Sequence, residues 1–275
     1  MGLGGYLTWT ALAREIHARH AVKTIPVELH GKITKLINSP VFYNNPHFIQ
    51  EFGEAGVQVQ LNNSLTNYCE IDTSSRAVHK SDKHIIETIC SAYGFENVEL
   101  KCEMFLDKKE DTKVQALLKL LPEDFVTIEP HSNVDYTVNR AYPFKKWEKI
   151  VGDISTHIPV VQIGTADKEL LSGAIDFRGK TTFRTAGGII EKSKLLLSTE
   201  GGLTHLATAF RTPALVILTG YQPRKMVEYP QNTYIDISSH GPCGLKIACK
   251  QCIEDAKSHN FKEVSELTLR YLETV

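Results

Sequence analysis

Short apolar stretches alternate with amphipathic helical stretches along most of this chain, and that alternation constrains the fold more than any other feature. In the second half, strands are predicted at 125–130, 159–164, 181–184, 194–199, 214–220 and 233–238. Helices are predicted around them at 144–155, 167–173, 185–192, 203–210 and 261–274. Such alternation is typical of parallel sheets covered by helices.

The first half repeats this pattern less regularly. Helices are predicted at 7–19 and at 82–93, where Ser81 or Asp82 supplies the N-cap, and strands at 24–29, 57–61 and 98–105. The charge-rich stretch 107–122 ends at Pro122 and marks the edge of a domain. We therefore expect an α/β protein with two Rossmann-like parallel-sheet domains, 1–120 and 121–275.

The composition narrows the classes of partner. A net charge of -1 over 275 residues gives no basic surface for nucleic acid or for an anionic membrane. No apolar run is long enough to cross a bilayer, so no transmembrane segment is expected. Met1 is followed by glycines rather than by a signal peptide, and the cytoplasm is the predicted location.

Polar residues follow three of the predicted strands, where parallel sheets bind their ligands. They are Ser132, Asn133 and Arg140, then Gly164, Thr165 and Asp167, then Glu200, Gly201 and Gly202, with Thr204 and His205 in the next helical turn. They supply hydroxyls and a cation for phosphate, carboxylates for ribose, and a helix N-terminus for a pyrophosphate. The same strand–glycine–helix turn also occurs in α/β proteins that bind nothing there.

Residues 200–205 resemble the D-[ST]-G-x-x-H signature of glycosyltransferase family 9, the heptosyltransferase group, whose GT-B fold has two Rossmann domains facing a cleft. Residues 140–143 are similar to the K-x-W-P element of that family, and 164–167 to its G-x-x-x-[DE] turn. The resemblance covers 125–225, and 2–20 more loosely. It implies that these residues hold a nucleotide-diphosphate sugar, with Arg140 on the phosphate.

Residues 2–8 resemble the glycine loop and first helix on the acceptor side of the family, which places Gly4, Gly5 and Tyr6 in an acceptor-side loop. Gly5 stands where family members usually carry the aspartate that acts as general base. The conceivable substitutes are Glu15, Glu70, Asp72 and His79. The first strand of the family precedes this loop, so the N-terminal domain is expected to be trimmed by a strand.

The resemblance implies an inverting glycosyltransferase that transfers a heptose-like or hexose sugar to a glycolipid, a protein or a small molecule. The departure at Gly5 leaves an alternative, a catalytically degenerate GT-B protein that binds a nucleotide sugar or a glycan. Residues 2–5 also suggest a nicotinamide-dependent oxidoreductase, but no G-x-G-x-x-G follows a strand. The near-neutral charge disfavours a zinc protein that binds nucleic acid.

The six cysteines fall into two groups. Cys69, Cys90 and Cys102 are scattered and are predicted to be small core residues. His240, Cys243, Cys249 and Cys252 form a compact set that suits structural zinc or iron, although reduced thiols on a loop are the alternative. The autotransporter heptosyltransferase branch of the resembled family has a cysteine-built metal finger near the C-terminus. No cofactor is expected for catalysis.

Overall fold

A six-stranded parallel sheet forms the centre of the second half of the molecule, in a computed structural model that describes residues 2–27, 39–61, 70–71 and 77–274. Its strands are β5 (Val126–Glu129), β6 (Val160–Gln162), β7 (Ile175–Asp176), β8 (Leu196–Thr199), β9 (Ala214–Leu218) and β10 (Thr233–Asp236). They lie in the order β7-β6-β5-β8-β9-β10. This is the 3-2-1-4-5-6 order of a doubly wound Rossmann sheet.

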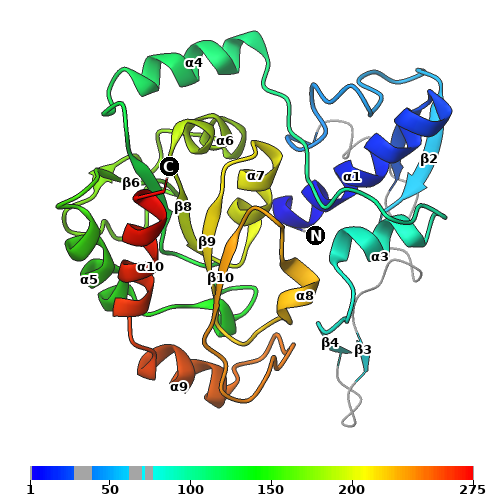
Figure 1. The fold of residues 1–275 in the computed structure, drawn as a ribbon. Helices are drawn as coiled ribbons and strands as arrows, with labels where there is room; N and C mark the ends of the chain where they lie inside the picture. The colour runs from blue at the N-terminus through cyan, green and yellow to red at the C-terminus, as the bar shows by residue number, and fades with distance from the viewer. Residues whose placement is uncertain (1, 28–38, 62–69, 72–76, 275) are drawn as a thin grey trace.

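Helices cover both faces of this sheet (Figure 1). On one face lie α5 (Phe144–Ile154), α9 (Lys250–Ser258) and α10 (Lys262–Leu272), and on the other lie α6 (Phe183–Lys192) and α7 (Gly202–Ala209). Successive residues of β8 enter opposite cores, because Leu197 packs with the α5 side and Leu196 with the α7 side. Burial on both faces explains why the parallel strands are continuous apolar runs.

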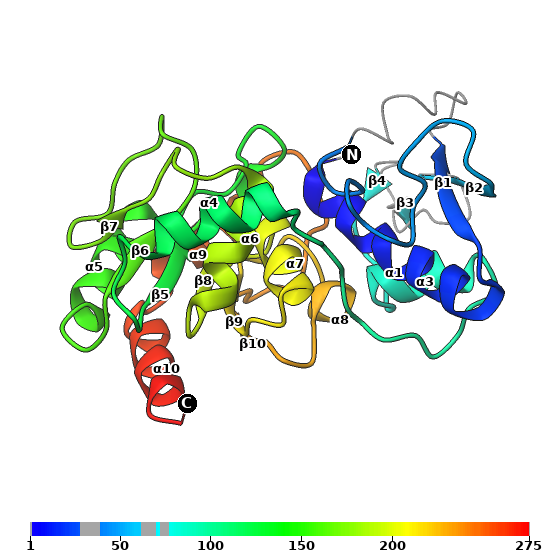
Figure 2. The same ribbon diagram turned by 90° about the horizontal axis from the view of Figure 1, so that it is seen from above.

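The described part of the first half contains a parallel pair and an antiparallel pair of strands. The parallel pair is β1 (Lys23–Val27) and β2 (Gly56–Gln60), the antiparallel pair is β3 (Glu70–Ile71) and β4 (Ala77–Val78), and the helices are α1 (Leu3–His20) and α3 (Ile85–Ser91). Helix α4 (Lys108–Leu118) follows and runs along α6 of the second half (Figure 2). The chain is completed by the 3-10 helix η2 (Val138–Arg140) and by α8 (Arg224–Val227).

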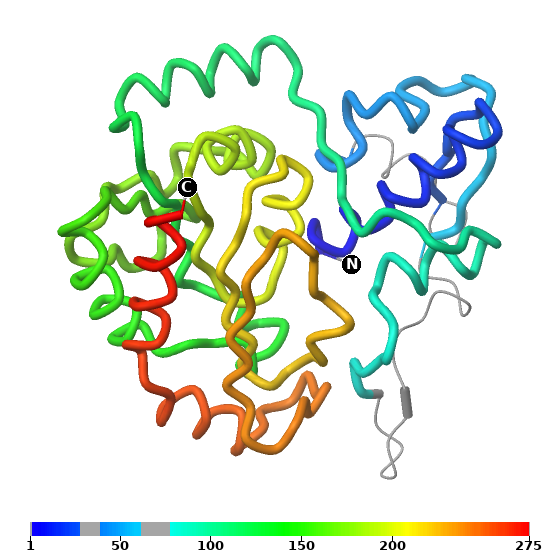
Figure 3. The backbone as a smooth tube through the Cα atoms, in the orientation of Figure 1, coloured from blue at the N-terminus to red at the C-terminus, as the bar shows by residue number. Residues whose placement is uncertain are grey.

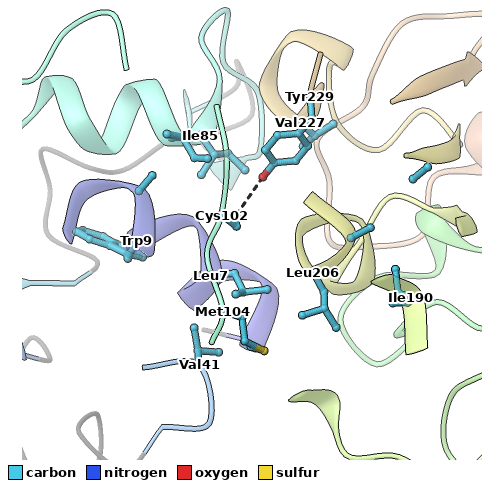
Figure 4. Close-up of a cluster of buried hydrophobic side chains, with 14 of the residues drawn as sticks. Leu7, Trp9, Val41, Ile85, Cys102, Met104, Ile190, Leu206, Val227 and Tyr229 are labelled. Carbon is cyan, nitrogen blue, oxygen red and sulfur yellow. Dashed lines mark hydrogen bonds between the residues drawn. The ribbon is translucent and has the colours of Figure 1, made fainter. Parts of the chain in front are cut away.

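The two halves are joined through a shared apolar core at the start of α1. Figure 4 shows Leu7 of α1 and Leu206 of α7 within one buried cluster, and the tube in Figure 3 places the N-terminus between the halves. The backbones also touch, since a Cβ atom on Gly4 would lie 2.6 Å from Gly202 Cα. Gly4 is therefore needed where α1 meets α7.

The α/β architecture with two separate parallel sheets confirms the predicted fold class. Three local predictions were wrong. Residues 98–105 belong to no strand, 167–173 form turns instead of a helix, and 181–184 open α6 instead of forming a strand.

Helix starts also differ from prediction. The N-cap of α3 is His84 rather than Ser81 or Asp82, because its Nδ1 accepts a hydrogen bond from Ile86 N at 3.1 Å. The predicted glycine loop is helical, since α1 begins at Leu3. Within the described ranges, no helix is both long enough and apolar enough to cross a membrane.

Candidate functional site

A cavity of about 560 Å³ lies at the carboxyl ends of β5 and β8. These strands are neighbours in the sheet, and the chain leaves them toward opposite edges, which makes their ends the topological switch point of the fold. The cavity, called the switch-point pocket below, is lined by Leu3, Glu129, 131–135, Arg140, 163–165, Lys168, 181–183, Ala186 and 198–203.

Eight of the predicted donor-binding residues line this pocket. They are Ser132, Asn133, Arg140, Gly164, Thr165, Glu200, Gly201 and Gly202. Asp167, Thr204 and His205 are not among the lining residues. Asp167 is exposed and hydrogen-bonds Thr165, which lowers its pKa, whereas Thr204 Oγ1 donates to Gly201 O at 2.7 Å.

One wall of the pocket carries backbone N–H groups with no partner among the described residues. Gly201 is the N-cap of α7 and provides no capping side chain, so the N–H groups of Gly202 and Leu203 make no hydrogen bond within the described residues. The hydroxyl of Ser132 is buried on the same pocket and is likewise unpartnered among the described residues. Free helix N–H groups and a hydroxyl are donors suited to an anion.

Arg140 brings a cation to this wall. Its Nε lies 2.9 Å from Glu200 Oε2, and its Nη2 donates to Gln222 Oε1 at 3.0 Å. The guanidinium lies over two rings that meet edge to face, those of Tyr136 and Tyr221, with its carbon 5.0 and 4.7 Å from the ring centroids. Burial raises the pKa of Glu200, while the charge of Arg140 opposes that shift.

His205 is held away from the pocket in the core. Its side chain is 4% exposed, and its Nδ1 lies 2.5 Å from the hydroxyl of Tyr229. Burial lowers the pKa of His205 to about 3, so the imidazole is neutral at physiological pH. His205 therefore packs on the core side of α7, and its neutral ring adds no charge to the pocket.

Glu129 is a pocket residue that the sequence reasoning missed. It is the last residue of β5, and a Cβ atom on Gly164 would overlap its carboxyl group. Burial raises the pKa of Glu129 to about 7, although the N–H of His131 donates to Oε1 at 2.8 Å. The available signal was its place at the carboxyl end of a strand in the interior of the sheet.

Residues 181–183 were also missed, because the predicted strand over 181–184 concealed a helix start. The Thr182 hydroxyl accepts from Thr185 N at 3.2 Å, and Thr185 Oγ1 accepts from Thr182 N at 2.9 Å. This reciprocal capping starts α6 at the pocket, beside the start of α7. The T-x-x-T spacing was the signal for it.

The acceptor-side residues Gly4, Gly5 and Tyr6 lie in the first turns of α1, and the neighbouring Leu3 lines the pocket. Glu15 is farther along α1 in ion pairs with Arg14 and Arg19, both at distances of 3.4 Å or less.

Two of the other substitute bases, His79 and Glu70, are described by the structure. His79 contacts the Tyr136 hydroxyl at 3.3 Å, and burial lowers its pKa to about 4. Asp72 lies outside the described residues, and only the backbone of Glu70 is described, in β3. The structure therefore brings no described substitute into the pocket lining.

The predicted metal ligands come together at the start of α9. One ligand atom each from His240, Cys249 and Cys252 lies within 4.8 Å of the other two. Cys252 Sγ is 3.4 Å from Cys243 Sγ and 3.8 Å from His240 Nε2, while Cys249 Sγ is 4.0 Å from the same nitrogen. Tetrahedral zinc with bonds of roughly 2.3 Å requires ligand separations of about 3.8 Å. His240, Cys249 and Cys252 lie close enough together to share such an ion, and Cys243 lies beside Cys252. These four residues are called the cysteine cluster below.

Neighbouring groups orient this cluster. Asp255 Oδ2 lies 3.1 Å from His240 Nδ1, which leaves Nε2 facing the sulfurs, as in histidines whose carboxylate partner fixes them for metal binding. Leu245 N donates to Cys243 Sγ at 3.4 Å, and the Cys252 thiol beside it lowers the pKa of Cys243 to about 6. Cys90 and Cys102 are buried core residues as predicted, and Cys69 lies outside the described residues.

No protein-family model and no curated protein matches the chain. Solved structures do. A glycosyltransferase family 9 protein from Veillonella parvula aligns with a TM-score of 0.64 and 10% identity over 100% of this chain and 94% of its own. The chain has the fold of glycosyltransferase family 9.

A second similar structure is the iron-containing dodecameric glycosyltransferase TibC from enterotoxigenic E. coli. It aligns with a TM-score of 0.70 and 12% identity over 100% of this chain and 74% of TibC. A structure of TibC in complex with ADP-D-β-D-heptose gives 0.68 and 14% over the same shares. At these identities the likeness concerns the fold.

Proposed function

We propose that this protein binds a nucleotide-diphosphate sugar in the switch-point pocket and transfers the sugar as an inverting glycosyltransferase. The observation that carries the proposal is that the uncapped start of α7, Arg140 and a Ser132 hydroxyl with no partner among the described residues all line this pocket. A cavity of about 560 Å³ is of the size that holds such ligands. The fold shared with TibC, which binds ADP-D-β-D-heptose, supports the same ligand class.

The chemistry assigned to the pocket is charge stabilisation. As the acceptor oxygen bonds to the anomeric carbon, the bond from that carbon to the diphosphate breaks and negative charge grows on the leaving group. Arg140, Lys168 and the N–H groups of Gly202 and Leu203 line the pocket and would stabilise that charge. The acceptor proton must pass to a base. In this proposal 121–275 is the donor side and 1–120 the acceptor side.

A second function, nucleotide-sugar binding without transfer, is favoured by the position of Gly5. It lies in the first turn of α1, at the place where an acid is expected, and has no side chain to accept a proton. The carboxyl groups in the pocket lining, Glu129, Asp135 and Glu200, all come from the second half of the chain.

The cysteine cluster is proposed to bind structural zinc or iron. His240 Nε2 and three sulfurs would fill a tetrahedral ion and leave no position for substrate. We therefore assign the ion a role in ordering the loop ahead of α9. Metal analysis tests this: the wild type should carry about one ion per chain and Cys252→Ser much less. Cys90→Ala is the control, because Cys90 is buried far along the chain from the cluster.

The function itself is tested by thermal unfolding with ADP, GDP, UDP and CDP and their sugars. One nucleotide class should raise the unfolding temperature, as any ligand of the native state does. If none does, both nucleotide-sugar functions are wrong. Slow hydrolysis of the stabilising donor without acceptor would support the enzyme, whereas binding with no turnover on any acceptor would support the non-catalytic binder.

A further inference from the structure

Asn139, the residue directly before Arg140, lies between the two sites described above. It is the middle residue of η2, and its side chain is 1% exposed. It lies outside the pocket lining, and no motif in the sequence singles it out. A fully buried amide must use its donors and its acceptor within the protein, so its partners reveal what it holds.

Three of those partners are backbone groups of the loop that carries the cysteines, and Nδ2 also donates to Cys243 Sγ at 3.6 Å. Asn139 Nδ2 donates to Leu245 O and Ile247 O, both at 2.8 Å, and Oδ1 accepts from Cys249 N at 2.8 Å. The Asn139 side chain thus binds the backbone of this loop at three residues, Leu245, Ile247 and Cys249. In addition, Thr219 Oγ1 donates to the Asn139 carbonyl at 2.6 Å, which ties η2 to the end of β9.

The same loop is also linked to the side-chain partners of Arg140. Gly220 O accepts from Cys243 N at 2.8 Å, and the next two residues, Tyr221 and Gln222, both contact the Arg140 guanidinium. The backbone before Arg140 and two of its side-chain partners are therefore held by the segment that carries the cysteine cluster. Both sets of contacts therefore act on Arg140, which lines the switch-point pocket.

We propose that Asn139 is a positioning residue that couples the order of the cysteine cluster to the placement of Arg140 in the switch-point pocket. The inference rests on the proposed function, because the benefit of placing Arg140 is donor binding. The cluster then supports donor binding from a distance and contributes no ligand of its own to the pocket. Loosening the loop would let η2 shift and weaken the contact between Arg140 and the diphosphate.

The test compares Asn139→Ala with Gln50→Ala. Gln50 is a matched control because its Nε2 donates to three backbone carbonyls, of Phe42, Asn45 and Phe48, and its Oε1 accepts from Asn44 N. It makes the same kinds of bond in the first half of the chain. We expect Asn139→Ala to raise the Kd for ADP at least about fivefold, and Gln50→Ala to leave it unchanged.

Coupling is tested with Cys252→Ser and the double variant. If Asn139 transmits the order of the cluster, Cys252→Ser raises the Kd for ADP by a similar factor, and the double variant is no weaker than the weaker single variant. Factors that multiply in the double variant would overturn the proposal, because they would show two independent effects. If Asn139→Ala does not fold, Asn139→Asp replaces it, since it keeps the acceptor and loses both donors.

A second readout needs no nucleotide. The Arg140 Nε–H resonance, assigned with Arg140→Lys, reports the pairing with Glu200 and should shift in Asn139→Ala and in Cys252→Ser but not in Gln50→Ala. An unmoved resonance in Asn139→Ala overturns the proposal even if ADP binding weakens. If the wild type binds no nucleotide, the proposed function fails, and the resonance alone decides whether Asn139 positions Arg140.

Discussion

The two halves of the molecule contribute unequally to the candidate site. All pocket-lining residues except Leu3 come from the segment 129–203 of the second half. The first half instead provides packing: α1 lies on α7 through Leu7 and through the contact of Gly4 with Gly202. Most contacts of the first half lie outside the pocket. We therefore expect substitutions there to change the free energy of unfolding without changing the affinity for a ligand.

Arg184 offers the largest test of this separation. It is buried in α6, and its guanidinium binds both Glu110 oxygens, at 2.6 and 2.8 Å, as well as Pro40 O at 2.7 Å. Arg184→Ala should lower the free energy of unfolding by about 3–5 kcal/mol, because it removes the cation paired with Glu110 and the donor to the Pro40 carbonyl. The Kd for ADP, measured below the unfolding transition, should change by less than about threefold.

The control for this prediction is Arg224→Ala, which removes an exposed pair with Glu228 at 2.7 Å. It should cost less than about 1 kcal/mol. A large rise in Kd for Arg184→Ala would show that the contacts of the first half shape the pocket after all, and the proposed separation would fail.

Arg140→Ala should differ from Arg184→Ala in its effect on ligand binding. Losing a charged donor to the diphosphate should raise the Kd for ADP about 10- to 100-fold. Arg19→Ala, which removes an ion-paired arginine of the first half, should leave the Kd unchanged. Isothermal titration of the folded proteins measures both, and equal affinities for Arg140→Ala and the wild type would remove Arg140 from the site.

Gly4→Ala tests the junction itself. The new Cβ atom would meet Gly202 Cα at 2.6 Å, and backbone cannot move aside as a flexible side chain does. We expect a loss of about 1–3 kcal/mol in the free energy of unfolding. Gly152→Ala in α5 is the control, since a Cβ there meets nothing within 4 Å. Equal stabilities of the two variants would argue against the tight α1–α7 contact.

The last test is a difference in pH dependence between the halves. The pKa of Glu129, raised from 4.5 to about 7 by burial, means that the folded state holds this proton more tightly than the unfolded state. Its contribution to stability is thus present below about pH 4.5 and is lost as the pH rises toward 7. Glu129→Gln should remove this part of the pH dependence of the free energy of unfolding, measured by denaturation at pH 5, 6 and 7.

His84 of the first half should act in the opposite direction. Burial lowers its pKa from 6.5 to about 4, so the unfolded state takes up the proton first and stability is lost as the pH falls through that window. Wild type and Glu129→Gln with parallel stability profiles between pH 5 and 7 would contradict the position assigned to Glu129.

The central sheet was predictable because its strands are apolar on both faces and end in glycine or polar residues. The structure of the segment 98–105 was not predictable. Its residues alternate as in a strand, but its backbone groups hydrogen-bond to side chains instead of to a neighbouring strand. Arg14 Nη2 donates to Glu99 O at 2.8 Å, and Glu103 N donates to Thr10 Oγ1 at 2.9 Å. Such long-range partners leave no periodic signal in the sequence.

The candidate site also has features that the sequence predicts and features that it does not. Ser132, Arg140 and Gly202 line one pocket, since strand ends of a parallel sheet converge, and their role in donor binding stays a prediction. The sequence did not separate the pocket lining from residues one helical turn away, so His205 was expected at the ligand although it lies buried against Tyr229. The direction of a side chain near a helix start depends on the packing behind the helix, which the sequence does not show.

The central claim is that the second half holds a nucleotide diphosphate at the start of α7. A crystal structure grown with ADP tests it most directly. The claim predicts the diphosphate within hydrogen-bond distance of Gly202 N, Leu203 N and the Ser132 hydroxyl, with Arg140 beside it. ADP bound elsewhere, or a pocket that stays free of nucleotide at saturating ADP, would contradict it.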